Sequence, residues 1–155
     1  MKWQKILTVV LVTGLLLITA NTVVAAGKST FFASLSGSEE VPPVETLTRG
    51  NVVFQLNQDR TELEYRLIVA NIEDVTAAHI HMGVPGVNGP VLVTLYSGGL
   101  IEGRFNGILA QGVISGQSLG EEAFEDLLEM IIAGETYVNV HTTEFPGGEI
   151  RGQIR

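Results

Sequence analysis

The histidines of this chain are the residues best suited to bind a transition metal. The chain has three, His79 and His81 in AHIHM and His141 in YVNVH. Side chains alternate between the two faces of a strand, so His79 and His81 would point the same way on a strand. Neutral imidazole is a good ligand for copper and zinc, and a third imidazole from another strand would complete a three-nitrogen site.

The residues around the histidines indicate which face of each strand is polar and which is apolar. In residues 137–141, Val138 and Val140 alternate with polar side chains, and in residues 78–82 apolar side chains alternate with the two histidines. If the two segments are neighbouring strands, the three imidazoles meet on one polar face. Two interpretations stay open: a mononuclear copper or zinc site, or surface or half-buried histidines that hydrogen-bond across strands.

Residues 1–26 are predicted to be a cleaved signal peptide. Two lysines and an apolar run over residues 6–18 are followed by small residues at 24–26. The apolar run is shorter than the roughly 20 residues that span a bilayer. We therefore expect one domain over residues 27–155, secreted or on the periplasmic or outer side of the cell envelope, with no membrane insertion after cleavage.

The net charge argues against nucleic acid as a partner, and the cysteine count excludes disulfides as a source of stability. After the leader, 7 basic residues remain of the 9 in the chain, against all 17 acidic ones. A chain this acidic is not expected to bind nucleic acid through bulk charge. It has no cysteine, so an exported domain would depend on packing and not on disulfides.

Short alternating segments predict an all-β fold. Turn residues at 57–60 separate two such segments, which suggests a hairpin. About eight strands at this spacing predict an antiparallel β-sandwich or barrel, and we take the sandwich as the expected fold. The expected strands cover residues 30–36, 50–56, 62–70, 76–82, 90–96, 105–114, 136–142 and 149–154. The loop at 36–46, with Pro42 and Pro43, is expected to be extended and edge-like.

One helix is expected over residues 119–133. It would have an apolar stripe, an acidic solvent-facing side and Gly134 as its C-terminal stop. Ser118 followed by Glu121 fits a capping box at its start.

Ser118 also lies in a nucleophile-elbow pattern with Gly116 and Gly120. A serine hydrolase is a further alternative, but the chain lacks the alternating strands and helices of the α/β-hydrolase fold.

The last strand carries Glu149 and Arg151 on one face, with Ile150 and Gly152 on the other. A cross-strand ion pair on an exposed face is the expected role of Arg151, and anion binding is the alternative.

Five short segments together resemble the CHRD (chordin-type) domain family. They stand in family order at residues 39–44, 77–81, 86–91, 137–142 and 146–154. The resemblance implies an immunoglobulin-like or superoxide-dismutase-like β-sandwich in an extracellular protein. It also implies that certain positions are hallmarks of the family, which here are His79, His81, His141, Gly148, Glu149, Arg151 and Gly152.

The resemblance supplies no reaction. The His-x-His strand is similar to the copper-binding strand of copper-zinc superoxide dismutase, but three histidines and no cysteine cannot make that two-metal site. We therefore expect a non-catalytic binding or structural module with an unknown protein or cell-surface ligand and no certain cofactor. The alternative is a copper or zinc protein, with or without redox activity, that uses His79, His81 and His141.

Overall fold

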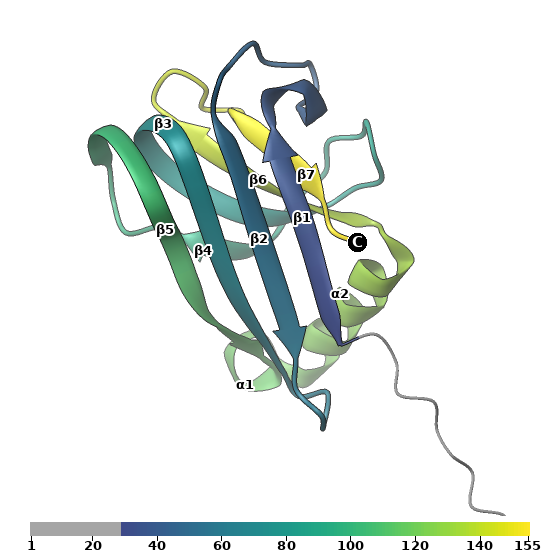
Figure 1. Ribbon diagram of the computed structural model, residues 1–155. Helices are drawn as coiled ribbons and strands as arrows, with labels where there is room; N and C mark the ends of the chain where they lie inside the picture. Colours follow the sequence, from purple (N-terminus) through teal and green to yellow (C-terminus); the bar gives the residue numbers. More distant parts are fainter. Residues whose placement is uncertain (1–28) are drawn as a thin grey trace, which may run out of the picture.

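A computed structural model of the chain describes residues 29–155. The predicted signal peptide, residues 1–26, lies outside these described residues. The fold is all-β and mostly antiparallel, with two helices between its later strands (Figure 1). In chain order the elements are β1 (Thr30–Ser36), η1 (Gly37–Glu39), β2 (Arg49–Leu56), β3 (Glu62–Met82), β4 (Val91–Tyr96), β5 (Ile101–Ser115), α1 (Gly116–Leu119), α2 (Glu121–Ala133), β6 (Thr136–Thr142) and β7 (Ile150–Gln153).

The long strand β3 closes the sheet into a barrel. Its first half pairs with β2 and its second half pairs with β6, and the order β2-β1-β7-β6-β3 returns to β2. These five strands form a closed ring. Strands β5 and β4 extend the sheet from the first and second halves of β3, respectively.

The predicted antiparallel all-β class is confirmed, but the eight-stranded sandwich is wrong. The segments 62–70 and 76–82, which we expected to be separate strands, are one strand in a seven-stranded sheet. The residues between them form an irregular stretch, with Asn71 and Asp74 at φ of 57° and 51° and with shifted registers toward β5. Such irregularities bend a strand without ending it, so β3 passes from one side of the barrel to the other.

The predicted alternation holds along most strands. Val138, Val140 and Ile80 are fully buried, and the polar residues between them point away from the core. Residues 57–61 join β2 and β3 as the predicted hairpin, whose strands are in antiparallel register from Arg49–Ala70 to Leu56–Leu63. The loop around Pro42 and Pro43 forms no strand.

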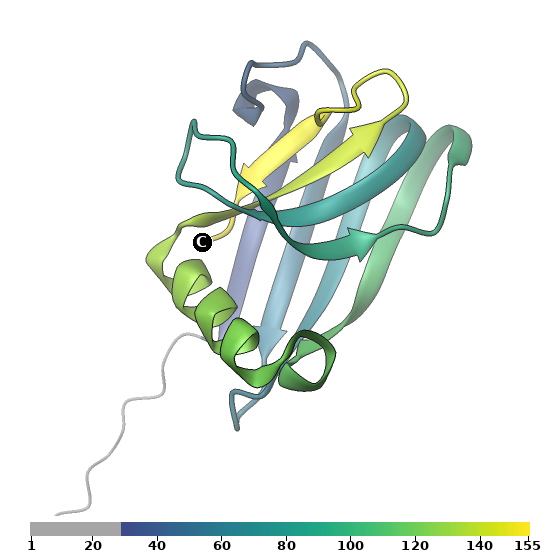
Figure 2. The ribbon, with the colours of Figure 1, turned by 180° about the vertical axis from the view of Figure 1, so that it is seen from behind.

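Helix α2 covers one end of the core. Its apolar stripe of Phe124, Leu127, Leu128 and Ile131 is buried, and Gly134 ends it at φ 74° as predicted. Both helices lie at the opposite end of the barrel from the loops at 37–48 and 143–149 (Figure 2). Within the described residues, neither helix is long and apolar enough to cross a membrane.

The predicted start of this helix is wrong. Helix α2 begins at Glu121, after Gly120 at φ 97°, and Ser118 belongs to the short helix α1. Ser118 reaches back to Ser115, accepting from its N–H at 3.0 Å and donating to its carbonyl at 2.9 Å. The glycine therefore separates two helical segments where the sequence pattern suggested one.

Closure of the barrel between β1 and β7 depends on Gly152. A Cβ at this position would lie 2.3 Å from the backbone oxygen of Ser34, so strand β1 would have to move. We expect Gly152→Ala to lower the free energy of unfolding by about 1–3 kcal/mol, the usual range for overpacking. Gly147→Ala is the matched control, since nothing lies within 4 Å of its Cβ. Equal midpoints of denaturant unfolding for the two variants would show that the seam tolerates a side chain.

Candidate metal site on the outer face of the barrel

Strands β7, β6 and β3 carry a polar face on the outside of the barrel. The antiparallel register sets Arg151 opposite Asn139, Asn139 opposite His79, and Tyr137 opposite His81. The valines and isoleucines between these residues fill the core. The three strands lie side by side in Figure 2, so polar residues far apart in sequence come together.

The structure brings all three histidines together on this face. Each ring places one nitrogen within 4.8 Å of a nitrogen of each of the others. Nδ1 of His79 lies 3.0 Å from Nε2 of His141. Bonds from zinc to imidazole nitrogen are about 2.0–2.1 Å, so two ligating nitrogens lie at most about 4 Å apart. Small ring rotations would therefore suffice to place the three nitrogens around one ion.

Backbone carbonyls orient two of the three rings. Nδ1 of His81 lies 2.9 Å from the Gly89 oxygen, and Nδ1 of His141 lies 3.0 Å from the Pro146 oxygen. A carbonyl only accepts, so each Nδ1 carries the proton and each Nε2 presents a lone pair. This arrangement is the usual one for ligating histidines, whose second nitrogen donates to a carbonyl or a carboxylate.

The two Nε2 atoms have different surroundings. Nε2 of His141 accepts the hydrogen bond from Nδ1 of His79. Nε2 of His81 is buried and has no hydrogen-bond partner among the described residues. Most buried polar atoms are hydrogen-bonded, and leaving one unpaired costs stability. His81 thus offers a buried lone pair beside two other imidazoles.

Burial favours the neutral form of His79 and of His141. Burial, assisted by the nearby rings of His141 and His81, lowers the pKa of His79 from 6.5 to about 4. Burial also lowers the pKa of His141, although its hydrogen bond to Pro146 opposes the shift. A metal binds only unprotonated imidazole, so at neutral pH these two rings are already in the required state.

Two loops cover the polar face beside the histidines. Loop 83–90 is held by Arg151, which is 2% exposed and donates to three loop oxygens. Loop 40–48 is held by Glu149, whose Oε1 accepts from the hydroxyls of Thr46 and Thr48. The predicted cross-strand ion pair of Arg151 on an exposed face is therefore wrong, because Arg151 is buried and donates to oxygens of loop 83–90.

Gly148 leaves space for a buried carboxylate. A Cβ on Gly148, at φ 127°, would lie 2.4 Å from Oε1 of Glu40 and 2.8 Å from Nδ2 of Asn139. Burial raises the pKa of Glu40 from 4.5 to about 7, even though the charge of Arg151 opposes this shift. Together with Gly152 at the seam, these contacts give a structural role to each of the four hallmark positions after His141.

Several contributors to this face were missed from the sequence. Tyr137, Glu40 and Asn139 lie in the segments that resemble the family, but their residue types gave them no role. The carbonyls of Gly89 and Pro146 have no side-chain signal at all. The turn-rich composition of residues 83–90, directly after the His-x-His strand, is a signal that could have pointed to a loop near the site.

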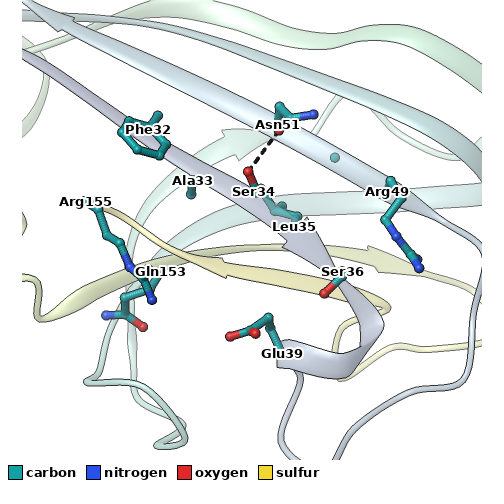
Figure 3. A pocket seen from close by; sticks show the side chains of 11 residues that line it. Phe32, Ala33, Ser34, Leu35, Ser36, Glu39, Arg49, Asn51, Gln153 and Arg155 are labelled. Carbon is teal, nitrogen blue, oxygen red and sulfur yellow. Dashed lines mark hydrogen bonds between the residues drawn. The ribbon is translucent and has the colours of Figure 1, made fainter.

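A separate groove of about 520 Å³ runs along β1, away from the histidines. Figure 3 shows Arg49 and Arg155 at its two ends and Ser34 hydrogen-bonded to Asn51 at 3.2 Å. Its lining includes Phe32 and Gln153 but none of the three imidazoles. The groove and the histidine cluster are therefore distinct features.

The fold and this face define a small antiparallel β-barrel with a clustered set of three histidines under two loops. The chain belongs to the CHRD domain family, whose model matches residues 31–154. At the level of the family, this membership supports a non-catalytic binding or structural module. Neither the curated proteins nor the solved structures compared with the chain give a match.

The pH dependence of folding tests the environment of His79. Between pH 6.5 and 4 the unfolded chain binds a proton at this residue that the folded protein does not, so this contribution to stability falls as the pH falls. Glu40 has the opposite effect between pH 4.5 and 7, since its pKa is higher in the folded state. The comparison must therefore be between the metal-free wild type and His79→Gln.

We expect the stability of the wild type to decrease more than that of His79→Gln when the pH is lowered from 6.5 to 4. Urea unfolding at several pH values measures this difference, and NMR titration of the His79 ring gives its pKa directly. A ring that titrates near 6.5 would contradict the account of its burial.

The hydrogen bonds of Ser118 argue against the serine hydrolase alternative. Its hydrogen bonds go to Ser115, and the described residues show no bond between Ser118 and His141, whose ring nitrogens contact His79 and Pro146. A serine without a base is a weak nucleophile. We expect a fluorophosphonate probe to leave the protein unlabelled, as judged by intact mass. Stoichiometric labelling that Ser118→Ala abolishes would support the hydrolase.

Proposed function

We propose that the protein is an exported, non-catalytic binding module and that its ligand is one copper or zinc ion, held by His79, His81 and His141. The observation that carries this proposal is the buried, unpartnered Nε2 of His81 within reach of the other two imidazoles. The ion itself is then the ligand, in place of the protein or cell-surface partner that the family resemblance alone suggested.

The donor set favours these two metals. All three donors are neutral imidazoles, which suit copper and zinc better than calcium or magnesium, since those prefer oxygen ligands. For a given nitrogen site, affinity normally peaks at Cu(II) in the divalent series. We therefore expect Cu(II) to bind more tightly than Zn(II).

Binding of a metal ion would also change the bonding of the ring nitrogens of His79 and His81. Nδ1 of His79 must carry the proton in its bond to His141, because Nε2 of His141 already acts as acceptor. An ion at the cluster would replace this hydrogen bond, and His79 would ligate through Nδ1 with its proton moved to Nε2. The same ion would give Nε2 of His81 the partner that it lacks.

An extracellular setting is part of the proposal. CHRD domains occur in extracellular and secreted proteins, and residues 1–26 have the pattern of a signal peptide. Histidine ligands suit such a setting because, unlike cysteine thiolates, they are not lost to oxidation.

Metal titration of the purified protein tests the proposal. We expect one Cu(II) per chain at pH 7, measured by calorimetry and elemental analysis after desalting. His81→Ala or His141→Ala should weaken binding by more than about 100-fold, because the loss of a residue that only hydrogen-bonds to a metal ligand already lowers the affinity by about 10–100-fold.

The control addresses the acidic surface. Glu125→Gln with Glu129→Gln removes two charges from the exposed side of α2 and should leave the affinity unchanged. A wild type that retains neither copper nor zinc would refute the proposal. So would binding that is lost with the α2 charges and kept without the histidines.

A further inference from the structure

We propose that Arg151 is a positioning residue for the metal site. It holds loop 83–90 and the ring of Tyr137 so that Nδ1–H of His81 stays bonded to Gly89 and Nε2 faces the other imidazoles. This inference rests on the proposed function for its metal-binding consequence. The hydrogen-bond geometry behind it exists in the metal-free protein.

The first step is the bonding of the guanidinium. Arg151 is 2% exposed, and a charge this buried needs its donors satisfied. Nη1 donates to Oδ1 of Asn88 at 2.9 Å, and Nη2 donates to the carbonyls of Val87 at 2.9 Å and Val84 at 3.3 Å. Loop 83–90 is thus fixed at three points by one side chain of β7.

The second step passes through Tyr137. The guanidinium carbon of Arg151 lies 3.4 Å from the centre of the Tyr137 ring, a cation–π contact. The same tyrosine stacks on His81, with centroids 4.9 Å apart and planes inclined by only 9°. Its hydroxyl accepts the Gly89 N–H at 3.3 Å. Arg151, Tyr137 and His81 therefore connect three successive strands.

Both routes meet at His81. The Gly89 carbonyl accepts from Nδ1 of His81, and the adjacent Asn88 is fixed by Arg151 on one side and by its own bond to the Val41 carbonyl, at 2.7 Å, on the other. The loop controls the hydrogen bond of the ring, and the stacked tyrosine controls its plane. The hydrogen bond to Gly89 and the stacking on Tyr137 must both be kept for Nε2 of His81 to face the other two imidazoles.

Two variants interrupt this arrangement at different points. Arg151→Lys keeps the charge but loses the planar fork that bonds several oxygens at once. Asn88→Ala removes an exposed side chain from the loop, so it should fold even if the arginine variant does not. Arg104→Lys is the matched control, because Arg104 is an exposed residue paired with Glu73.

The first measurement needs no metal. NMR of the ring nitrogens reports which nitrogen of His81 is protonated. We expect the wild type and Arg104→Lys to show the Nδ1–H form alone, and Asn88→Ala and Arg151→Lys to show a mixture of both forms. An unchanged His81 ring in folded Asn88→Ala and Arg151→Lys would overturn the positioning role, whatever the metal does.

The second measurement is a Cu(II) titration of the same proteins. We expect Asn88→Ala and Arg151→Lys to bind Cu(II) about 10–100-fold more weakly than the wild type, the usual effect of losing a residue that orients a metal ligand. The control should match the wild type. Unchanged affinity in both variants would overturn the inference, whereas a wild type that takes up no copper would refute the proposed function and leave the ring measurement to decide the positioning role.

Discussion

The architecture depends on β3 remaining one hydrogen-bonded strand while it bends. Its first half pairs with β2 and β5, and its second half pairs with β4 and β6. Because the bend lies between these halves, the same strand contributes Leu63 and Leu67 to one side of the core and Ile80 to the other. A break at Asn71–Asp74 would separate the His79–His81 segment from the barrel that supports it.

The outer face of β7, β6 and β3 shows the consequence of burying polar groups. Arg151, Glu149 and Glu40 are each less than a tenth exposed, and such groups are costly unless bonded. The chain satisfies the first two with loops that fold back over the sheet. The loop that bonds Arg151 also supplies the carbonyl that orients His81, so the support of the face and the geometry of the candidate site have the same origin.

Alternation was the reliable signal in the sequence. It correctly placed His79, His81 and His141 on the strand face opposite to the face that carries the buried residues. The expected strand at 136–142 matches β6. It could not distinguish two strands from one bent strand, because a bulge at Asn71 and Asp74 has the same turn-like composition as a loop. It also gave Arg151 an exposed ion pair, since burial here comes from loop 83–90, and the path of a loop is not encoded in the strand pattern. The convergence of the imidazoles followed only once the pairing of β3 with β6 was known.

The proposed metal site combines three imidazoles, two of them with a fixed Nδ1–H group, and one buried lone pair on His81 that has no hydrogen-bond partner among the described residues. The most direct test of this claim is X-ray absorption spectroscopy of the copper-loaded protein at pH 7. We expect three nitrogen ligands at about 2.0 Å with the outer-shell scattering of imidazole rings. Coordination by oxygen atoms alone, without imidazole scattering, would contradict the account.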